Sequence, residues 1–215
     1  MALTSRSGPG DGHILITGTG RSGTTLLVQY FTALGFDTGF TPEQIERRID
    51  DVSHAGLETP LTRDPLPYVA KSPFYTGSLG TALDAGEVQV AACVVPMRDL
   101  FAAAESRRRV SAAAVAAGKD PASARGGLTF QAQKRPKKQE ERLAVQFYKL
   151  LHALVRHDVP TYFLNFPGFA NGERDLYADL EPLLAAHGVT AEESAAALAR
   201  VARVDLITDF TQPGE

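Results

Sequence analysis

A glycine-rich loop that carries hydroxyl and basic side chains follows a short apolar run near the start of the chain. The run Ile14–Ile16 leads into Gly18-Thr-Gly-Arg-Ser-Gly-Thr-Thr25, and apolar residues resume at Leu26. This order predicts a strand, a loop and the first turn of a helix. Backbone N–H groups at a helix N-terminus point towards anions, and the helix dipole favours negative charge there. The sequence therefore predicts a phosphate-binding loop.

The loop matches two nucleotide-binding patterns only in part. Its three glycines have the Gly-x-Gly-x-x-Gly spacing, but a dinucleotide fold also needs a second strand ending in an acid about 20 residues on. Asp37 is the nearest acid, and the predicted helix leaves no room for that strand. Two of the glycines also fit the NTPase loop, in which a lysine reaches the β- and γ-phosphates. Thr24 stands at the lysine position, with Arg21 as a substitute inside the loop, so an ATP-dependent small-molecule kinase is an alternative.

The segment Arg21-Ser-Gly-Thr-Thr-Leu26 resembles the 5′-phosphosulfate-binding loop of sulfotransferases. These enzymes use 3′-phosphoadenosine 5′-phosphosulfate (PAPS) as co-substrate. The cytosolic members have lysine where this chain has Arg21, whereas tyrosylprotein-type and many bacterial members have arginine. The resemblance implies that PAPS is held by Gly20, Arg21, Ser22, Gly23, Thr24, Thr25 and Leu26, without a metal.

A second family motif, the 3′-phosphate site, has an arginine at a strand end and a serine eight positions later. Here Arg98 follows the apolar run Val88–Met97, and Ser106 lies eight residues further on, in a predicted helix. Eight helical residues rise roughly 12 Å and turn roughly 800°, so a long arginine and a serine can reach one phosphate. Leu100 departs from the proline that the family often has here. The matches cover residues 13–110.

Lys71-Ser-Pro73 resembles the Lys-x-Pro segment of several sulfotransferases, in which the lysine faces the sulfuryl group or the acceptor. Sulfuryl transfer places negative charge on the bridging oxygen that leaves with the nucleotide, and a cation stabilises that charge. We expect Arg21 to take this role, with Lys71 as a second cation. The cytosolic enzymes have a catalytic histidine two residues after the lysine, where this chain has Pro73.

An acceptor hydroxyl also needs a general base, and three residues are candidates. Glu43 lies near the spacing of the glutamate base of tyrosylprotein enzymes, but it also suits the first turn of a helix. His54 lies in a predicted loop. Glu58 precedes the Lys71 strand and has no helix-capping role in the sequence. We therefore rank Glu58 first, with Glu43 and His54 as alternatives.

Strands that alternate with helices predict an α/β fold, a three-layer α/β/α arrangement around a central parallel sheet, as in P-loop NTPases. The carboxyl ends of such strands share one edge, which would bring Gly18, Lys71 and Arg98 together. The basic run Arg107–Arg109 is interpreted as a solvated helix face. The expected strands are 14–16, 68–71, 88–97 and 161–164, and the expected helices are 24–34, 42–51, 74–85, 100–117, 140–156, 173–187 and 191–206.

Length and pattern predict one domain over residues 13–209, with a flexible segment at 1–12 and a tail at 210–215. The polar stretch 118–136 is either a lid or a disordered connector. Because one compact domain leaves little surface for a polymer, we expect a small-molecule acceptor. A nucleotide-binding module without catalysis is the other alternative.

The composition indicates a cytoplasmic protein. A formal net charge of −3 argues against a general nucleic-acid binder. Cys93 is the only cysteine, and its apolar surroundings predict a buried side chain on a core strand. No run approaches the roughly 18 apolar residues of a membrane span. The sequence gives no indication of the oligomeric state.

Overall fold

The computed structural model describes residues 6, 12–51, 53–120, 126–129, 132, 135–208 and 210. Its centre is a four-stranded sheet in the order β2-β1-β3-β4. Each neighbouring pair of strands runs parallel. The strands are β1 (His13–Ile16), β2 (Val69–Lys71), β3 (Val90–Met97) and β4 (Thr161–Asn165).

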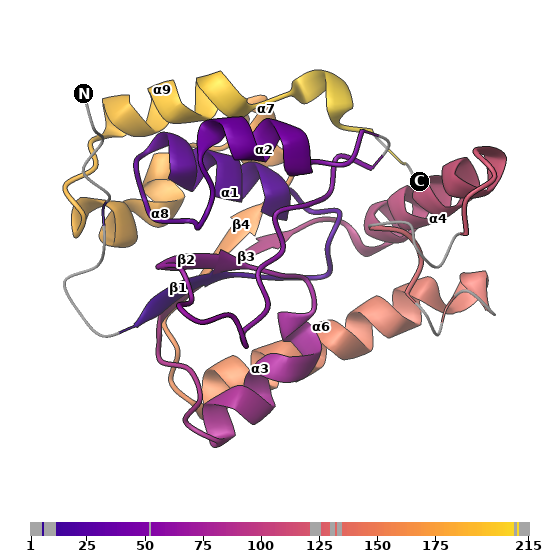
Figure 1. Cartoon of the computed structure of the whole chain (residues 1–215), viewed down its shortest axis with the longest axis horizontal. Helices are drawn as coiled ribbons and strands as arrows, with labels where there is room; N and C mark the ends of the chain where they lie inside the picture. Colours follow the sequence, from indigo (N-terminus) through magenta and orange to yellow (C-terminus); the bar gives the residue numbers. More distant parts are fainter. Residues whose placement is uncertain are drawn as a thin grey trace.

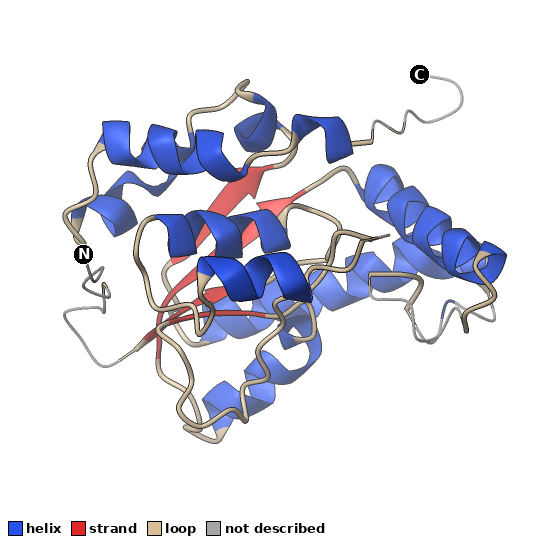
Figure 2. Ribbon diagram, turned by 45° about the horizontal axis from the view of Figure 1, so that its top comes forward, coloured by secondary structure: helices blue, strands red, loops and turns tan. Residues whose placement is uncertain are grey.

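Helices cover both faces of this sheet, as Figures 1 and 2 show. The arrangement confirms the expected α/β fold with a parallel sheet between two helical layers. The α-helices are α1 (Thr24–Ala33), α2 (Pro42–Arg48), α3 (Tyr75–Asp84), α4 (Leu100–Ala116), α6 (Gln139–Arg156), α7 (Gly168–Asn171), α8 (Leu176–Ala185) and α9 (Ala191–Val201), and the 3₁₀ turns are η2 (Pro136–Lys138) and η3 (Val204–Leu206).

The two faces of the sheet belong to separate apolar cores. Ile14 and Ile16 of β1 are fully buried among side chains of α1, α8 and α9. Leu15, between them, is buried on the other face against residues of α3 and α6. This alternation follows from the two-residue period of a strand. Cys93 of β3 joins the second core, which confirms its predicted burial, and burial raises the pKa of its thiol to about 12.

Local capping signals place several helix starts where the sequence predicts them. Thr41 forms the expected capping box with Gln44 at the start of α2. The carboxylate of Asp99 accepts a hydrogen bond of 2.8 Å from the Ala102 N–H at the start of α4. The helix ends are less well predicted. The helix expected over 42–51 ends at Arg48, and the helix expected over 191–206 ends at Val201. The short helix α7 was not predicted.

The carboxyl ends of the strands share one edge of the sheet. Ile16, which ends β1, pairs with Lys71, which ends β2. Arg98 follows the last residue of β3 directly. The fold therefore brings the glycine-rich loop, Lys71 and Arg98 to the same edge of the sheet, as expected.

Several predicted segments lie partly outside the described residues. They are the segment 1–12, the connector 118–136 and the tail 210–215. Among the described helices, none is both long enough and apolar enough to cross a membrane.

Candidate functional site

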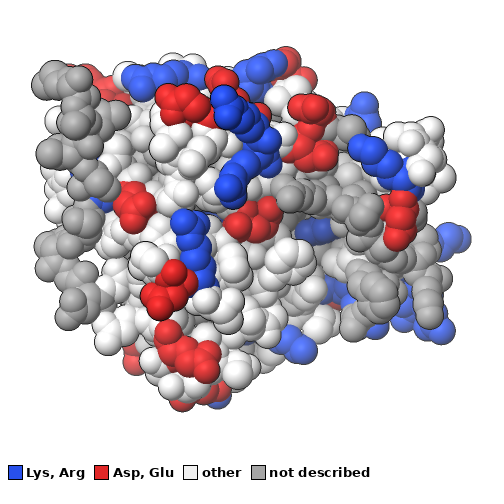
Figure 3. Space-filling view, in the orientation of Figure 1, with Lys and Arg blue, Asp and Glu red and all other residues white. Residues whose placement is uncertain are grey.

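A cavity of about 1740 Å³ lies at the carboxyl edge of the sheet. Most of the predicted site residues line it: Gly20, Arg21, Gly23, Thr24, Thr25, Leu26, His54, Glu58, Lys71, Arg98 and Ser106. Ligand pockets of α/β proteins occupy this edge. Basic and acidic side chains are interspersed over the face seen in Figure 3. The cavity is thus built where the sequence placed the site.

The loop after β1 has the backbone of an anion cradle. Gly20, Arg21 and Gly23 have φ angles of 70°, 60° and 86°. Gly23 is also the N-cap of α1, so the loop leads directly into the first N–H groups of that helix. Successive left-handed residues turn backbone N–H groups towards a common point, which favours a bound anion. The left-handed Arg21 is unusual for a residue with a side chain.

Ser22 supplies a second indication of an anion at the loop. Its side chain is fully buried, and its Oγ has no hydrogen-bond partner among the residues the structure describes. Buried hydroxyls are ordinarily hydrogen-bonded, so an unsatisfied one needs an explanation. An oxygen of a bound phosphate would satisfy this hydroxyl.

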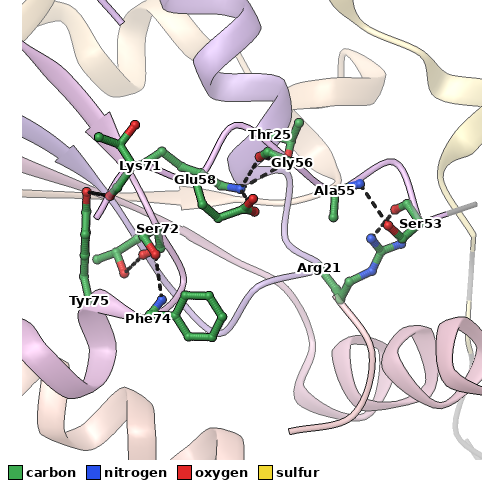
Figure 4. A network of polar contacts seen from close by, with 12 residues as sticks. Arg21, Thr25, Ser53, Ala55, Gly56, Glu58, Lys71, Ser72, Phe74 and Tyr75 are labelled. Carbon is green, nitrogen blue, oxygen red and sulfur yellow. Dashed lines mark hydrogen bonds and ion pairs between the residues drawn. The ribbon is translucent and has the colours of Figure 1, made fainter. Parts of the chain in front are cut away.

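The side chain of Arg21 reaches away from the loop towards α4 and the 53–58 segment. Its Nε donates to the Oγ of Ser106 at 3.0 Å, and its Nη1 donates to the carbonyl of Ser53. Burial, and next the nearby charge of Arg98, lowers the pKa of Arg21 to about 10. Figure 4 shows Arg21 beside Ser53, at the opposite end of the view from Lys71.

Arg98 approaches the same loop residue from another side. Its Nη1 donates to the carbonyl oxygen of Arg21 at 3.2 Å, and its Nη2 donates to the carbonyl of Thr208. Its guanidinium carbon lies 5.5 Å from the ring centre of Phe166 and 5.7 Å from that of Phe210. Arg98 and Ser106, the predicted pair, therefore both contact Arg21, Arg98 at its backbone carbonyl and Ser106 at its side chain.

Lys71 forms a second polar cluster in the cavity, with Glu58 (Figure 4). The lysine side chain is only 2% exposed, and its Nζ lies 2.7 Å from Oε1 of Glu58. The same Nζ donates to the Gly56 carbonyl at 2.7 Å and to the Thr25 Oγ at 3.3 Å. Thr25 belongs to the glycine-rich loop, so this cation is linked to that loop. Glu58 is 25% exposed and thus accessible from the cavity.

The two alternative bases occupy different positions. His54 is exposed, has a φ of 50° and lines the cavity. Glu43 is exposed on the first turn of α2, and the residues that line the cavity do not include it. A hydrogen bond with the Thr41 side chain is the main cause of a lowered pKa at Glu43. Of the three candidate bases, Glu58 is the one for which the described residues show an ion pair with a predicted cation, Lys71.

Arg107 is a cavity residue that the sequence interpretation missed. The expected solvated face is wrong for this position, because Arg107 is only 8% exposed and lines the cavity. Arg108 is instead partly exposed and paired with Glu140, and Arg109 is exposed. A signal was present in the sequence: Ala103, Val110 and Ala114 share a helical stripe with Arg107 and are all buried.

Comparison of the chain with protein-family models, curated proteins and solved structures finds no match. Within the described part of the chain, no group of three or more His, Cys, Asp or Glu side chains is arranged to hold a metal ion.

Proposed function

We propose that this protein is a sulfotransferase that moves a sulfuryl group from PAPS to the hydroxyl of a small molecule. The observation that carries this proposal is that Arg98 and Ser106 each form a hydrogen bond with Arg21 of the glycine-rich loop. It supports a second anion site next to the phosphate cradle, as a nucleotide with both a 5′- and a 3′-phosphate requires.

The loop suits the 5′ end of this nucleotide. The N-terminal N–H groups of α1 and the unpaired Ser22 hydroxyl supply donors for one phosphate group. Arg98 and Ser106 would supply a cation and a hydroxyl for the other, and arginine is well suited to bidentate binding of phosphate oxygens. A cavity of about 1740 Å³ also leaves space for an acceptor beside the nucleotide.

The kinase alternative is less well supported at Thr25. In an NTPase loop the hydroxyl at this position binds the metal ion of the nucleotide. Here the Thr25 Oγ accepts a hydrogen bond from Lys71 at 3.3 Å and donates one to the Gly56 carbonyl at 3.4 Å. Thr24, at the position of the phosphate-binding lysine, is buried.

Glu58 and Lys71 would take the chemical roles in the transfer. The acceptor oxygen attacks sulfur, its proton passes to the Glu58 carboxylate, and the bond from sulfur to the bridging oxygen breaks. The electron pair of that bond leaves with adenosine 3′,5′-bisphosphate. Lys71, next to Thr25 of the loop, would stabilise the charge on the leaving oxygen. Arg21 would contribute there only if its side chain released Ser53 and Ser106.

A nucleotide panel tests the proposal. Calorimetry and thermal shift would compare adenosine 3′,5′-bisphosphate with AMP, with NAD, and with ATP in the presence and absence of magnesium. We expect the bisphosphate to bind most tightly and to raise the melting temperature most. Transfer of radioactive sulfate from labelled PAPS to a panel of small alcohols and phenols then tests turnover.

Arg98→Met tests the second phosphate site directly. We expect this variant to lose at least tenfold in affinity for the bisphosphate and much less for AMP, which lacks the 3′-phosphate. A preference of the wild type for magnesium-ATP or NAD would refute the sulfotransferase proposal. Tight bisphosphate binding without transfer to any acceptor would favour a nucleotide-binding module instead.

A further inference from the structure

A buried arginine joins the glycine-rich loop to a distant segment. Arg107, in the middle of α4, donates from Nη2 to the Thr19 carbonyl and from Nη1 to the Gly127 carbonyl, each at 2.6 Å. Thr19 lies inside the loop, and Gly127 lies in the segment 126–129, which also lines the cavity. The planar guanidinium thus holds two backbone segments that are far apart in the sequence.

The loop is shaped to admit this side chain. Gly20, next to Thr19, has a φ of +70°, and a Cβ at this position would lie 2.5 Å from the Arg107 Nη2. The left-handed backbone therefore favours glycine there, and any larger residue would displace the end of the arginine side chain. The close approach places the guanidinium directly against the phosphate cradle.

The charge of Arg107 is not balanced by an acid within the described part of the chain. Its hydrogen-bond acceptors there are carbonyls, and its Nε, which is buried, has no partner. Burial, followed by the nearby charge of Arg21, lowers the pKa of Arg107 to about 10, so both influences act against its cation. A buried, unbalanced charge destabilises a protein unless a counter-charge arrives.

The uncompensated charge of Arg107 and the Ser22 hydroxyl, which has no partner among the described residues, both border the glycine-rich loop. Thr19, whose carbonyl accepts from Arg107, lies three residues before Ser22. One anion bound at the loop would resolve both features. A purely structural arginine would instead be expected to have a carboxylate partner or to satisfy all its donors.

We infer that Arg107 is a positioning residue that fixes the glycine-rich loop against the segment 126–129 and supplies a buried positive charge that a bound phosphate balances. This inference extends the proposed function to a further residue, but it requires only a phosphate ligand at the loop and not sulfuryl transfer itself.

Three variants test this inference. Arg107→Met removes the charge and both hydrogen bonds, Arg107→Lys keeps the charge, and Arg109→Met removes an exposed arginine from the same helix as a control. Calorimetry would measure the affinity for adenosine 3′,5′-bisphosphate, ADP and inorganic pyrophosphate. Thermal unfolding would be recorded without ligand.

We expect Arg107→Met to lose at least tenfold in affinity for whichever phosphate the wild type binds. Its ligand-free melting temperature should not fall, because the unbalanced buried charge is gone. Arg107→Lys should bind at least threefold more tightly than Arg107→Met, whereas Arg109→Met should stay within twofold of the wild type. If Arg107→Met does not fold, Arg107→Gln takes its place in the comparison with Arg107→Lys.

Affinity within twofold of the wild type in the uncharged variant would overturn the inference. So would equal affinities of the lysine and the uncharged variants, because charge would then have no role. If the wild type prefers ADP or pyrophosphate to the bisphosphate, the sulfotransferase proposal fails, and Arg107 is still tested with the ligand that binds. If it binds none of the three, both fail.

Discussion

The Nε of Arg21 donates a hydrogen bond of 3.0 Å to the Oγ of Ser106, although the two residues lie 85 positions apart in the chain. One residue belongs to the loop after β1, and the other belongs to α4, which follows β3. The contact therefore joins the glycine-rich loop to the helix that presents Ser106. If the protein binds PAPS as proposed, this contact would help to set the spacing between the two phosphates.

Ser106→Ala should weaken binding of the 3′-phosphate selectively. We expect affinity for adenosine 3′,5′-bisphosphate to fall about tenfold, as the loss of a hydrogen bond to a charged group of about 1.5 kcal/mol implies. Affinity for AMP should change less than twofold, and calorimetry with both ligands measures the ratio. Ser78→Ala is a suitable control, because Ser78 is an exposed serine of α3 that does not line the cavity. An equal loss for both nucleotides would contradict a 3′-phosphate role for Ser106.

Glu58→Gln should reduce turnover by about 100-fold, the range of a lost general base. Glutamine can still accept a hydrogen bond from Lys71 but cannot take up a proton, so bisphosphate affinity should stay within twofold. Steady-state rates and calorimetry separate the two effects. Glu46→Gln, which changes an exposed glutamate of the same cavity lining, should keep full activity. A fully active Glu58→Gln would transfer the role to His54 or Glu43.

Gly20→Ala should weaken nucleotide binding at least tenfold, because the new Cβ would lie 2.5 Å from the Arg107 Nη2 and displace this guanidinium from the loop. Gly118→Ala provides a matched control: its φ is +69°, close to the +70° of Gly20, but no described atom lies within 4 Å of its Cβ position. We expect the control to lose about 1 kcal/mol of stability from the left-handed backbone alone, with unchanged affinity. Urea unfolding and calorimetry measure both quantities, and equal behaviour of the two variants would argue against a tight fit at the loop.

Stability should decrease in alkaline solution, because the thiol of Cys93 and the phenol of Tyr30 are buried and stay protonated in the folded protein. Burial raises the pKa of Cys93 from 9.0 to about 12, and it is the main cause of a rise at Tyr30 from 10.0 to about 12. Above pH 9 the unfolded chain loses protons that the folded state retains. The unfolding free energy then falls by up to about 1.4 kcal/mol per pH unit for each group. This contribution is complete below pH 9 and is lost between pH 9 and 12.

Urea unfolding of the wild type and Cys93→Ala at pH 8, 9, 10 and 11 measures this effect. The variant will be less stable throughout, because it lacks a buried side chain, but its stability should decline less steeply with pH. Parallel curves for the two proteins would show that Cys93 does not contribute to the alkaline decline.

The sequence predicts the framework of the site well because its signals are local. Apolar runs define the strands, and parallel strands necessarily align Gly18, Lys71 and Arg98 at one edge. The capping residues Thr41 and Asp99 likewise fix the starts of α2 and α4. The strands and the helix starts depend only on neighbours in the chain, and the common edge follows once the strands pair in parallel.

Two features of the candidate site depend on long-range contacts and were not predictable in the same way. The helical stripe of Arg107 indicates that it faces inwards, but its partners, the loop and the segment 126–129, are distant in the chain and are not indicated by the basic run. The pairing of Lys71 with Glu58 depends on the path of the chain between them, which has no regular periodicity. The sequence identified both residues of this pair, but not their contact.

The contacts of Arg21 with Arg98 and Ser106 span 77 and 85 residues, and both cross between elements that meet only in the completed sheet. A nascent chain that ends before residue 98 contains the whole cradle but neither partner. Preference for a 3′-phosphate would therefore emerge late in folding, after β3 has docked beside β1. Nucleotide selectivity would then serve as a reporter of native topology during refolding, distinguishing the finished sheet from a collapsed chain that has only its first β-α unit in place.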